Sequence, residues 1–134
     1  MKYVALMFSV LIVIVTLLSH GCSGDDGAWE NDSIPPEVCI TSPHDGDTVR
    51  GYLVITASVT DDVAVRVVYF QFFAQENKTW QRVFSDCDTD EPYEYRSLDV
   101  GQFRDSSQVK IRVSAYDMAY NLNSDEIYVV VMNW

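Results

Sequence analysis

The sequence predicts an all-β fold, an antiparallel sandwich of about seven strands. Three observations support this prediction. Short runs alternate between apolar and polar residues, which is typical of half-buried strands. Clusters of turn-forming residues separate these runs at regular spacing, and no segment has the period of a helix. Seven short strands in about 100 residues are characteristic of two packed sheets.

The first three predicted strands cover residues 38–41, 53–59 and 65–73. A turn at residues 43–46, which contains proline and glycine, separates the first two strands. The third strand is rich in β-branched and aromatic residues and is apolar on both faces. We therefore expect it to be central in a sheet.

The four remaining strands are predicted at residues 79–84, 93–98, 109–115 and 127–132. The first of them follows a hairpin at residues 74–78, in which Asn77 is the best candidate for a positive φ. Polar loops are expected at residues 86–92 and 117–125. The prediction is therefore a chain of short strands joined by short turns.

The N-terminal segment has the parts of an export signal. Lys2 supplies a positive charge, residues 4–18 are mostly apolar, and small residues follow. The apolar run is short for a membrane span, which needs about 20 apolar residues. We therefore expect the rest of the chain to lie outside the cytoplasm.

The end of this segment resembles the lipobox of bacterial lipoproteins, in which a cysteine after a small residue is lipidated. Gly21 and Cys22 fit that pattern, whereas Ser19 stands where the family usually has leucine. The resemblance implies a signal peptide over residues 1–21, lipidation at Cys22 and a membrane-anchored protein of the cell envelope. An ordinary signal peptide and an uncleaved anchor are the alternatives.

Residues 22–33 are predicted to form a flexible tether. They are rich in serine, glycine and aspartate and contain too few apolar side chains to form a core. The sandwich domain is then expected to cover residues 34–134.

Two cysteines remain besides the lipidation candidate, Cys39 and Cys87. Export implies an oxidising compartment, where paired thiols persist as disulfides. We therefore expect a bridge between Cys39 and Cys87, with two unpaired thiols as the alternative. The chain has no Cys-x-x-Cys motif, and His44 is the only histidine after residue 21, so the spacing does not favour zinc.

The charge balance excludes one class of partner and the histidine content disfavours catalysis. Nine Lys+Arg and twenty Asp+Glu give a net charge of −11, and such a chain repels nucleic acid. A serine triad or a cysteine nucleophile would have to use His44, which is predicted to lie in a tight turn. We therefore expect no enzyme and no nucleic-acid partner, and calcium is the one cofactor considered.

Three segments resemble the bacterial Ig-like domains of surface and secreted proteins: residues 40–49, 59–65 and 115–121. The likeness covers nearly all of residues 34–132 and rests mainly on turn residues. It implies an immunoglobulin-like β-sandwich and says little about function. The chain departs from the family at Tyr120, where glycine is usual.

Acidic residues are expected to gather at one end of this topology. The start of the first strand and the loops after the second and sixth strands would bring together Glu37, Asp61, Asp62, Asp117 and Asn121. Calcium takes six to eight oxygen ligands, so these residues form a candidate calcium site. The alternative is that Asp61 and Asp117 only accept hydrogen bonds from loop amides and fix the turns.

Exposed aromatic residues would offer a ligand platform for sugar or protein, and its candidates are Trp80, Tyr93 and Tyr95, with Phe103 and Trp134 beside them. Since alternating strands bury half of such residues, burial in the core is the alternative. The sequence thus predicts a cell-envelope binding or scaffold module that contacts an extracytoplasmic protein. A carbohydrate-binding accessory domain and a calcium-stabilised adhesion module are the other hypotheses.

Overall fold

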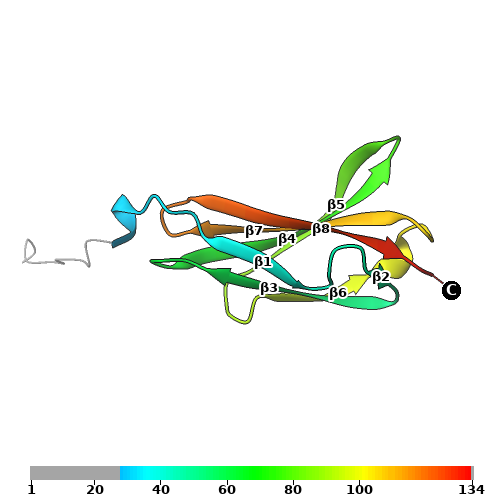
Figure 1. The fold of residues 1–134 in the computed structure, drawn as a ribbon, viewed down its shortest axis with the longest axis horizontal. Coiled ribbons are helices and arrows are strands. Elements are labelled where there is room, and N and C mark those ends of the chain that lie inside the picture. Colours follow the sequence, from blue (N-terminus) through cyan, green and yellow to red (C-terminus); the bar gives the residue numbers. More distant parts are fainter. Residues whose placement is uncertain (1–27, 134) are drawn as a thin grey trace, which may run out of the picture.

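The computed structural model describes residues 28–133, which form two β-sheets packed face to face (Figure 1). The strands are β1 Glu37–Ser42, β2 Thr48–Val49, β3 Tyr52–Thr60, β4 Val65–Glu76, β5 Thr79–Asp88, β6 Glu94–Asp99, β7 Gln108–Asp117 and β8 Leu122–Val131. One sheet has the order β1-β3-β6 and the other has the order β2-β8-β7-β4-β5. The predicted all-β sandwich is confirmed.

The strands differ from the sequence prediction at their ends. The two-residue strand β2 pairs with the end of β8 and lies in a segment that was predicted to be a connection. Strand β4 continues to Glu76, so the hairpin turn is only Asn77 and Lys78, with φ values of 50° and 66°. The prediction of a positive φ at Asn77 is confirmed.

Strand β8 begins five residues earlier than expected, and two of its first residues are polar side chains that bond to β1 and to the residue before it. Asp125 Oδ2 accepts a hydrogen bond from the Ile40 backbone N–H at 2.9 Å. Asn123 donates from its side-chain nitrogen to the Pro36 carbonyl oxygen at 2.9 Å. Polar residues therefore occupy inward positions there, and the apolar alternation that reveals a strand is lost.

The core lies between the two sheets and is centred on β4 and β7. Alternate residues of these strands are fully or almost fully buried, namely Val68, Phe70, Phe72, Val109, Ile111, Val113 and Ala115. Ile55 of β3 and Leu98 of β6 meet them from the three-stranded sheet. Burial of one such side chain stabilises the fold by about 1.5–3 kcal/mol.

The hairpin of β4 and β5 extends beyond the body of the sandwich (Figure 1). Residues 81–87 of β5 are exposed, because β5 is the edge strand of the five-stranded sheet. One face of this sheet packs on the core and the other faces away from it. We call the second face the outer face.

The described chain starts and ends at opposite ends of the domain's long axis (Figure 1). A short 3-10 helix, η1 Ala28–Asn31, precedes β1, and a second, η2 Val100–Gln102, follows β6. Within residues 28–133 no helix is long and apolar enough to cross a membrane. The predicted signal peptide, Cys22 and most of the predicted tether lie outside the described residues, as does Trp134.

Candidate functional site

Three aspartates from separate segments meet at the end of the sandwich where the described chain begins. Asp32 follows η1, Asp61 follows β3 and Asp117 ends β7. One carboxylate oxygen from each lies within 4.8 Å of the others. Asp117 is completely buried, and the other two are half-buried. We call these three residues the acidic cluster.

Two members of the acidic cluster fix the turns that carry them. Asp61 Oδ2 accepts hydrogen bonds from the backbone N–H groups of Val63 at 3.0 Å and Ala64 at 2.8 Å. Asp117 accepts bonds of 2.8 Å from both the backbone N–H and the side-chain amide of Asn121. The turn-fixing role considered for Asp61 and Asp117 is therefore present.

These bonds leave part of the acidic cluster without donors. Asp32 Oδ1 accepts a bond from the Ile34 N–H at 2.9 Å. Asp32 Oδ2 and Asp61 Oδ1 are shielded from solvent and have no hydrogen-bond partner. Shielded carboxylate oxygens of this kind are destabilising unless a donor or a cation compensates them.

The charges in the acidic cluster repel one another. The Ile34 N–H lowers the pKa of Asp32, but desolvation and nearby carboxylates raise it by more, so the pKa lies above its ordinary value of 3.8. The carboxylates that raise it belong to Asp62, Asp117 and Asp61. A bound divalent cation would remove this repulsion.

The structure brings together part of the predicted calcium set. Asp61, Asp117 and Asn121 meet as expected, and Asp62 contributes its charge from nearby. Glu37 is exposed on β1, opposite Thr60, and is not part of the group. The amide of Asn121 also donates to the Asp32 carbonyl oxygen at 3.0 Å, so it joins the N-terminal segment to the β7–β8 turn.

Asp32 is the member that the sequence analysis missed. It lies in the stretch predicted to be a flexible tether, where acidic residues are expected to be solvated. In the structure this segment carries η1 and is tied to the domain through Asn121. Its position as an acidic residue shortly before the first strand is the one sequence signal that could have indicated it.

The predicted disulfide between Cys39 and Cys87 is wrong, because both residues are exposed free thiols. Cys39 lies on β1, an edge of the three-stranded sheet, and Cys87 lies on β5, an edge of the five-stranded sheet. Strand β1 lies against β8, whereas β6 lies beside β5. The two cysteines are therefore at opposite edges of the sandwich.

The predicted aromatic platform is not assembled. Tyr93 is buried, and the ring of Tyr95 lies between the sheets, 5.4 Å from the rings of both Phe72 and Phe84. Trp80 lies on the outer face, 5.5 Å from the Tyr128 ring. Burial raises the pKa values of both Tyr93 and Tyr95, and nearby acidic residues raise them further. Phe103 is also buried.

A family model described as a bacterial Ig domain matches residues 36–113. The chain belongs to the bacterial Ig domain family. Domains of this family are commonly extracellular or surface-associated, and their fold is typically non-catalytic.

Two solved structures with a similar fold belong to larger chains, of which this chain spans less than half. The fibronectin(III)-like modules of CbhA from Clostridium thermocellum match with a TM-score of 0.54 and 24% identity, over 75% of this chain and 48% of that one. An endo-beta-1,4-mannanase from Thermotoga petrophila matches with a TM-score of 0.55 and 15% identity, over 78% of this chain and 21% of that one. Both likenesses concern the fold alone. Among curated proteins, none matches this sequence.

Proposed function

We propose that this protein is a non-catalytic binding or scaffold module of the cell envelope, anchored through lipid at Cys22 and stabilised by calcium. The acidic cluster is the observation that carries the proposal. Asp32, Asp61 and Asp117 gather their carboxylates, and two of their shielded oxygens have no donor. The family supports a surface location and a role in binding or spacing rather than catalysis.

The chemistry of the acidic cluster favours a hard divalent cation. Every ligand offered is a carboxylate oxygen, which is the donor that calcium prefers, and water can complete its six to eight ligands. Each of the three aspartates comes from a different segment. A cation bound there would tie the N-terminal segment to the loops after β3 and β7, close to where the chain leaves the proposed membrane anchor.

Thermal melting of the full-length protein tests the calcium site. Calcium is expected to raise the melting temperature, because a ligand that binds only the folded state stabilises it, by about 2.7 kcal/mol at a hundred times its Kd. Asp32→Asn and Asp61→Asn should each remove most of that increase. Asp90→Asn, in the exposed loop between β5 and β6, is the matched control and should keep it.

Magnesium provides a second arm of the same experiment. Because magnesium is smaller and keeps more of its water, it should shift the melting temperature less than calcium does. A melting temperature unaffected by millimolar calcium would contradict the calcium site.

Fatty-acid labelling tests the anchor, which rests on the likeness of Gly21-Cys22 to a lipobox. The wild-type protein should incorporate label and the Cys22→Ser variant should not. Equal incorporation by the two proteins would contradict lipidation at this residue.

A further inference from the structure

The outer face of the five-stranded sheet has a charge opposite to that of the chain. It holds Arg82 on β5 and Lys110 and Arg112 on β7, and Arg66 lies beside them at the start of β4. These are four of the eight bases among residues 28–133. Of the outward-pointing residues on β4, β5, β7 and β8, Glu126 is the only acid. Basic side chains are therefore concentrated on one face of an acidic protein.

A groove of about 630 Å³ runs across this face. Its sides are formed by arginine and tyrosine, namely Arg66, Arg82, Arg112, Tyr69, Tyr116 and Tyr120. The rings of Tyr69 and Tyr116 meet edge to face, with centroids 6.1 Å apart. The groove extends from β5 across β4 and β7 to β8, so it crosses the strands and does not follow a free strand edge. We call it the arginine groove.

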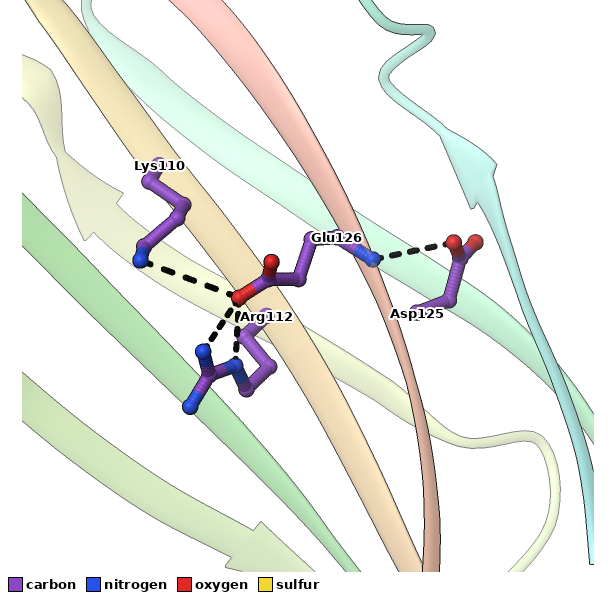
Figure 2. A network of polar contacts seen from close by, with 4 residues as sticks. All are labelled: Lys110, Arg112, Asp125 and Glu126. Carbon is purple, nitrogen blue, oxygen red and sulfur yellow. Dashed lines mark hydrogen bonds and ion pairs between the residues drawn. The ribbon is translucent and has the colours of Figure 1, made fainter.

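Two arginines of the groove have no carboxylate partner. Figure 2 shows Arg112 and Lys110 reaching the same oxygen of Glu126, the Lys110 Nζ at 3.7 Å. No carboxylate of residues 28–133 lies within ion-pair distance of Arg66 or Arg82. Their guanidinium groups are therefore available to an anion from outside, and guanidinium binds carboxylates through paired hydrogen bonds.

Tyr120 contributes an aromatic ring to the rim of the groove, although its own backbone conformation is unfavourable. Its φ is 66°, a left-handed value that disfavours any residue with a Cβ. The side chain is 63% exposed, and its ring lies 4.5 Å from the Arg66 guanidinium carbon. A tyrosine here orients an arginine and exposes an aromatic surface, and glycine would do neither.

We propose that the arginine groove binds an acidic polysaccharide. Arg66 and Arg82 would pair with the carboxylates of its uronate units, and the tyrosine rings would pack against the apolar faces of the sugar rings. Gln71 and Ser85 also line the groove and can bond to sugar hydroxyls. This inference names the partner of the binding module proposed above and rests on that function.

An acidic polypeptide fits the groove less well. Extended peptides commonly bind by adding a strand to a free sheet edge, where backbone groups pair. The arginine groove runs across the strands rather than along the free edge of β5, and the other strands it crosses already pair on both sides, so its floor presents side chains. Aromatic surface, hydroxyl and amide groups and unpaired arginines together match a sugar chain that carries carboxylates.

Hyaluronan oligosaccharides are a suitable probe, measured by calorimetry with full-length protein in detergent at a fixed calcium concentration. Binding should be detectable, should weaken as salt rises, and should fall at least tenfold in Arg82→Glu and in Arg66→Glu. Arg104→Glu makes the same charge change at an exposed site away from the groove and should bind like the wild type. Equal losses in Arg104→Glu would overturn the site.

Two further probes decide the chemistry of the partner. Carboxyl-reduced hyaluronan has the same sugar rings without charge and should bind much more weakly, so equal binding would overturn the role of the arginines. Polyglutamate that binds as tightly as hyaluronan would overturn the polysaccharide in favour of a polypeptide. Absence of binding to all probes would overturn the inference.

Tyr120→Gly separates binding from folding. It should weaken hyaluronan binding severalfold while leaving the melting temperature unchanged or higher, because it relieves the left-handed backbone. Unchanged binding would remove Tyr120 from the site. The calcium-dependent melting shift is a separate measurement, so a wild-type protein that shows this shift but fails to bind hyaluronan would count against this inference alone.

Discussion

The acidic cluster and the arginine groove place charge on the same small domain in different ways. The three aspartates lie on loops and strand ends far apart in the sequence, and Asp117 is completely buried. The arginines lie on or beside neighbouring strands, where the register of the sheet fixes their spacing and water solvates them. The acidic cluster therefore contributes to the stability of the fold, whereas the stability of the fold does not depend on the side chains of the arginine groove.

This difference predicts how the two regions respond to mutation. A buried charge that loses its partners is strongly destabilising, whereas an exposed ion pair contributes little to stability. Changes in the acidic cluster should therefore alter folding, and changes in the arginine groove should alter binding.

The largest effect is expected for Asp117→Ala. The change removes two hydrogen bonds to Asn121 and one carboxylate of the cluster, and it should lower the free energy of unfolding by about 3 kcal/mol. Arg112→Ala, on the same strand, should lower it by less than about 1 kcal/mol. Denaturant unfolding of both variants tests the contrast, and equal losses would contradict it.

Tyr120→Gly should raise the free energy of unfolding by about 1 kcal/mol. The left-handed backbone at this position disfavours tyrosine by about 1–2 kcal/mol, and the loss of its contact with Arg66 offsets part of the gain. Equilibrium unfolding measures the effect. A destabilised variant would show that the ring supports the fold, and the contrast between the two regions would then be weaker.

Glu126→Gln should change stability by less than about 0.5 kcal/mol, since Glu126 and Arg112 are partly exposed and the buried Lys110 keeps its contacts with the Phe73 and Trp80 rings. It also frees both bases and should strengthen hyaluronan binding about threefold, which calorimetry can measure. Asp45→Asn is an acid-to-amide control outside the groove and should leave affinity unchanged. A weaker complex would indicate that Glu126 positions Arg112 for binding.

The smallest effect concerns Tyr93, a buried polar group that is neutral at physiological pH. Burial and the acidic neighbours Glu91, Asp88 and Asp90 raise its pKa above 10.0. The unfolded state therefore ionises first, so the stability that Tyr93 contributes is complete below about pH 10 and is lost above it. Stability measured from pH 9 to 11 should fall less steeply in Tyr93→Phe, and identical slopes would contradict the raised pKa.

The sequence contained enough information to predict the core but not the partners of polar residues. The apolar alternation of residues 109–115 depends on burial alone, and the strand was predicted correctly. The start of β8 was missed because Asn123 and Asp125 are polar and point inward, where groups of the β1 segment satisfy them. Such partners lie more than eighty residues away and leave no local signal.

The candidate site shows the same limit. Asp61 and Asp117 were found because the loops after the second and sixth predicted strands lie at one end of this topology, but Asp32 joins them only through the path of the N-terminal segment. Trp80, Tyr93 and Tyr95 were grouped because alternation along a strand does not reveal which of its two faces packs on the core. Tyr93 and the Tyr95 ring face the core, whereas Trp80 lies on the outer face.

The placement of the two chain ends has a mechanical consequence. Since the described chain begins and ends at opposite ends of the long axis, tension between an anchor and a distant contact would run along the strands (Figure 1). Strand β1 is joined along its length to β3, and its Ile40 N–H is bonded to β8, so such a pull loads these bonds together in shear rather than one at a time. Asp32 precedes β1 in the chain, so the same pull reaches it first. The bond from Asn121 to the Asp32 carbonyl oxygen, and a bound cation, would have to break before tension reaches the sheet.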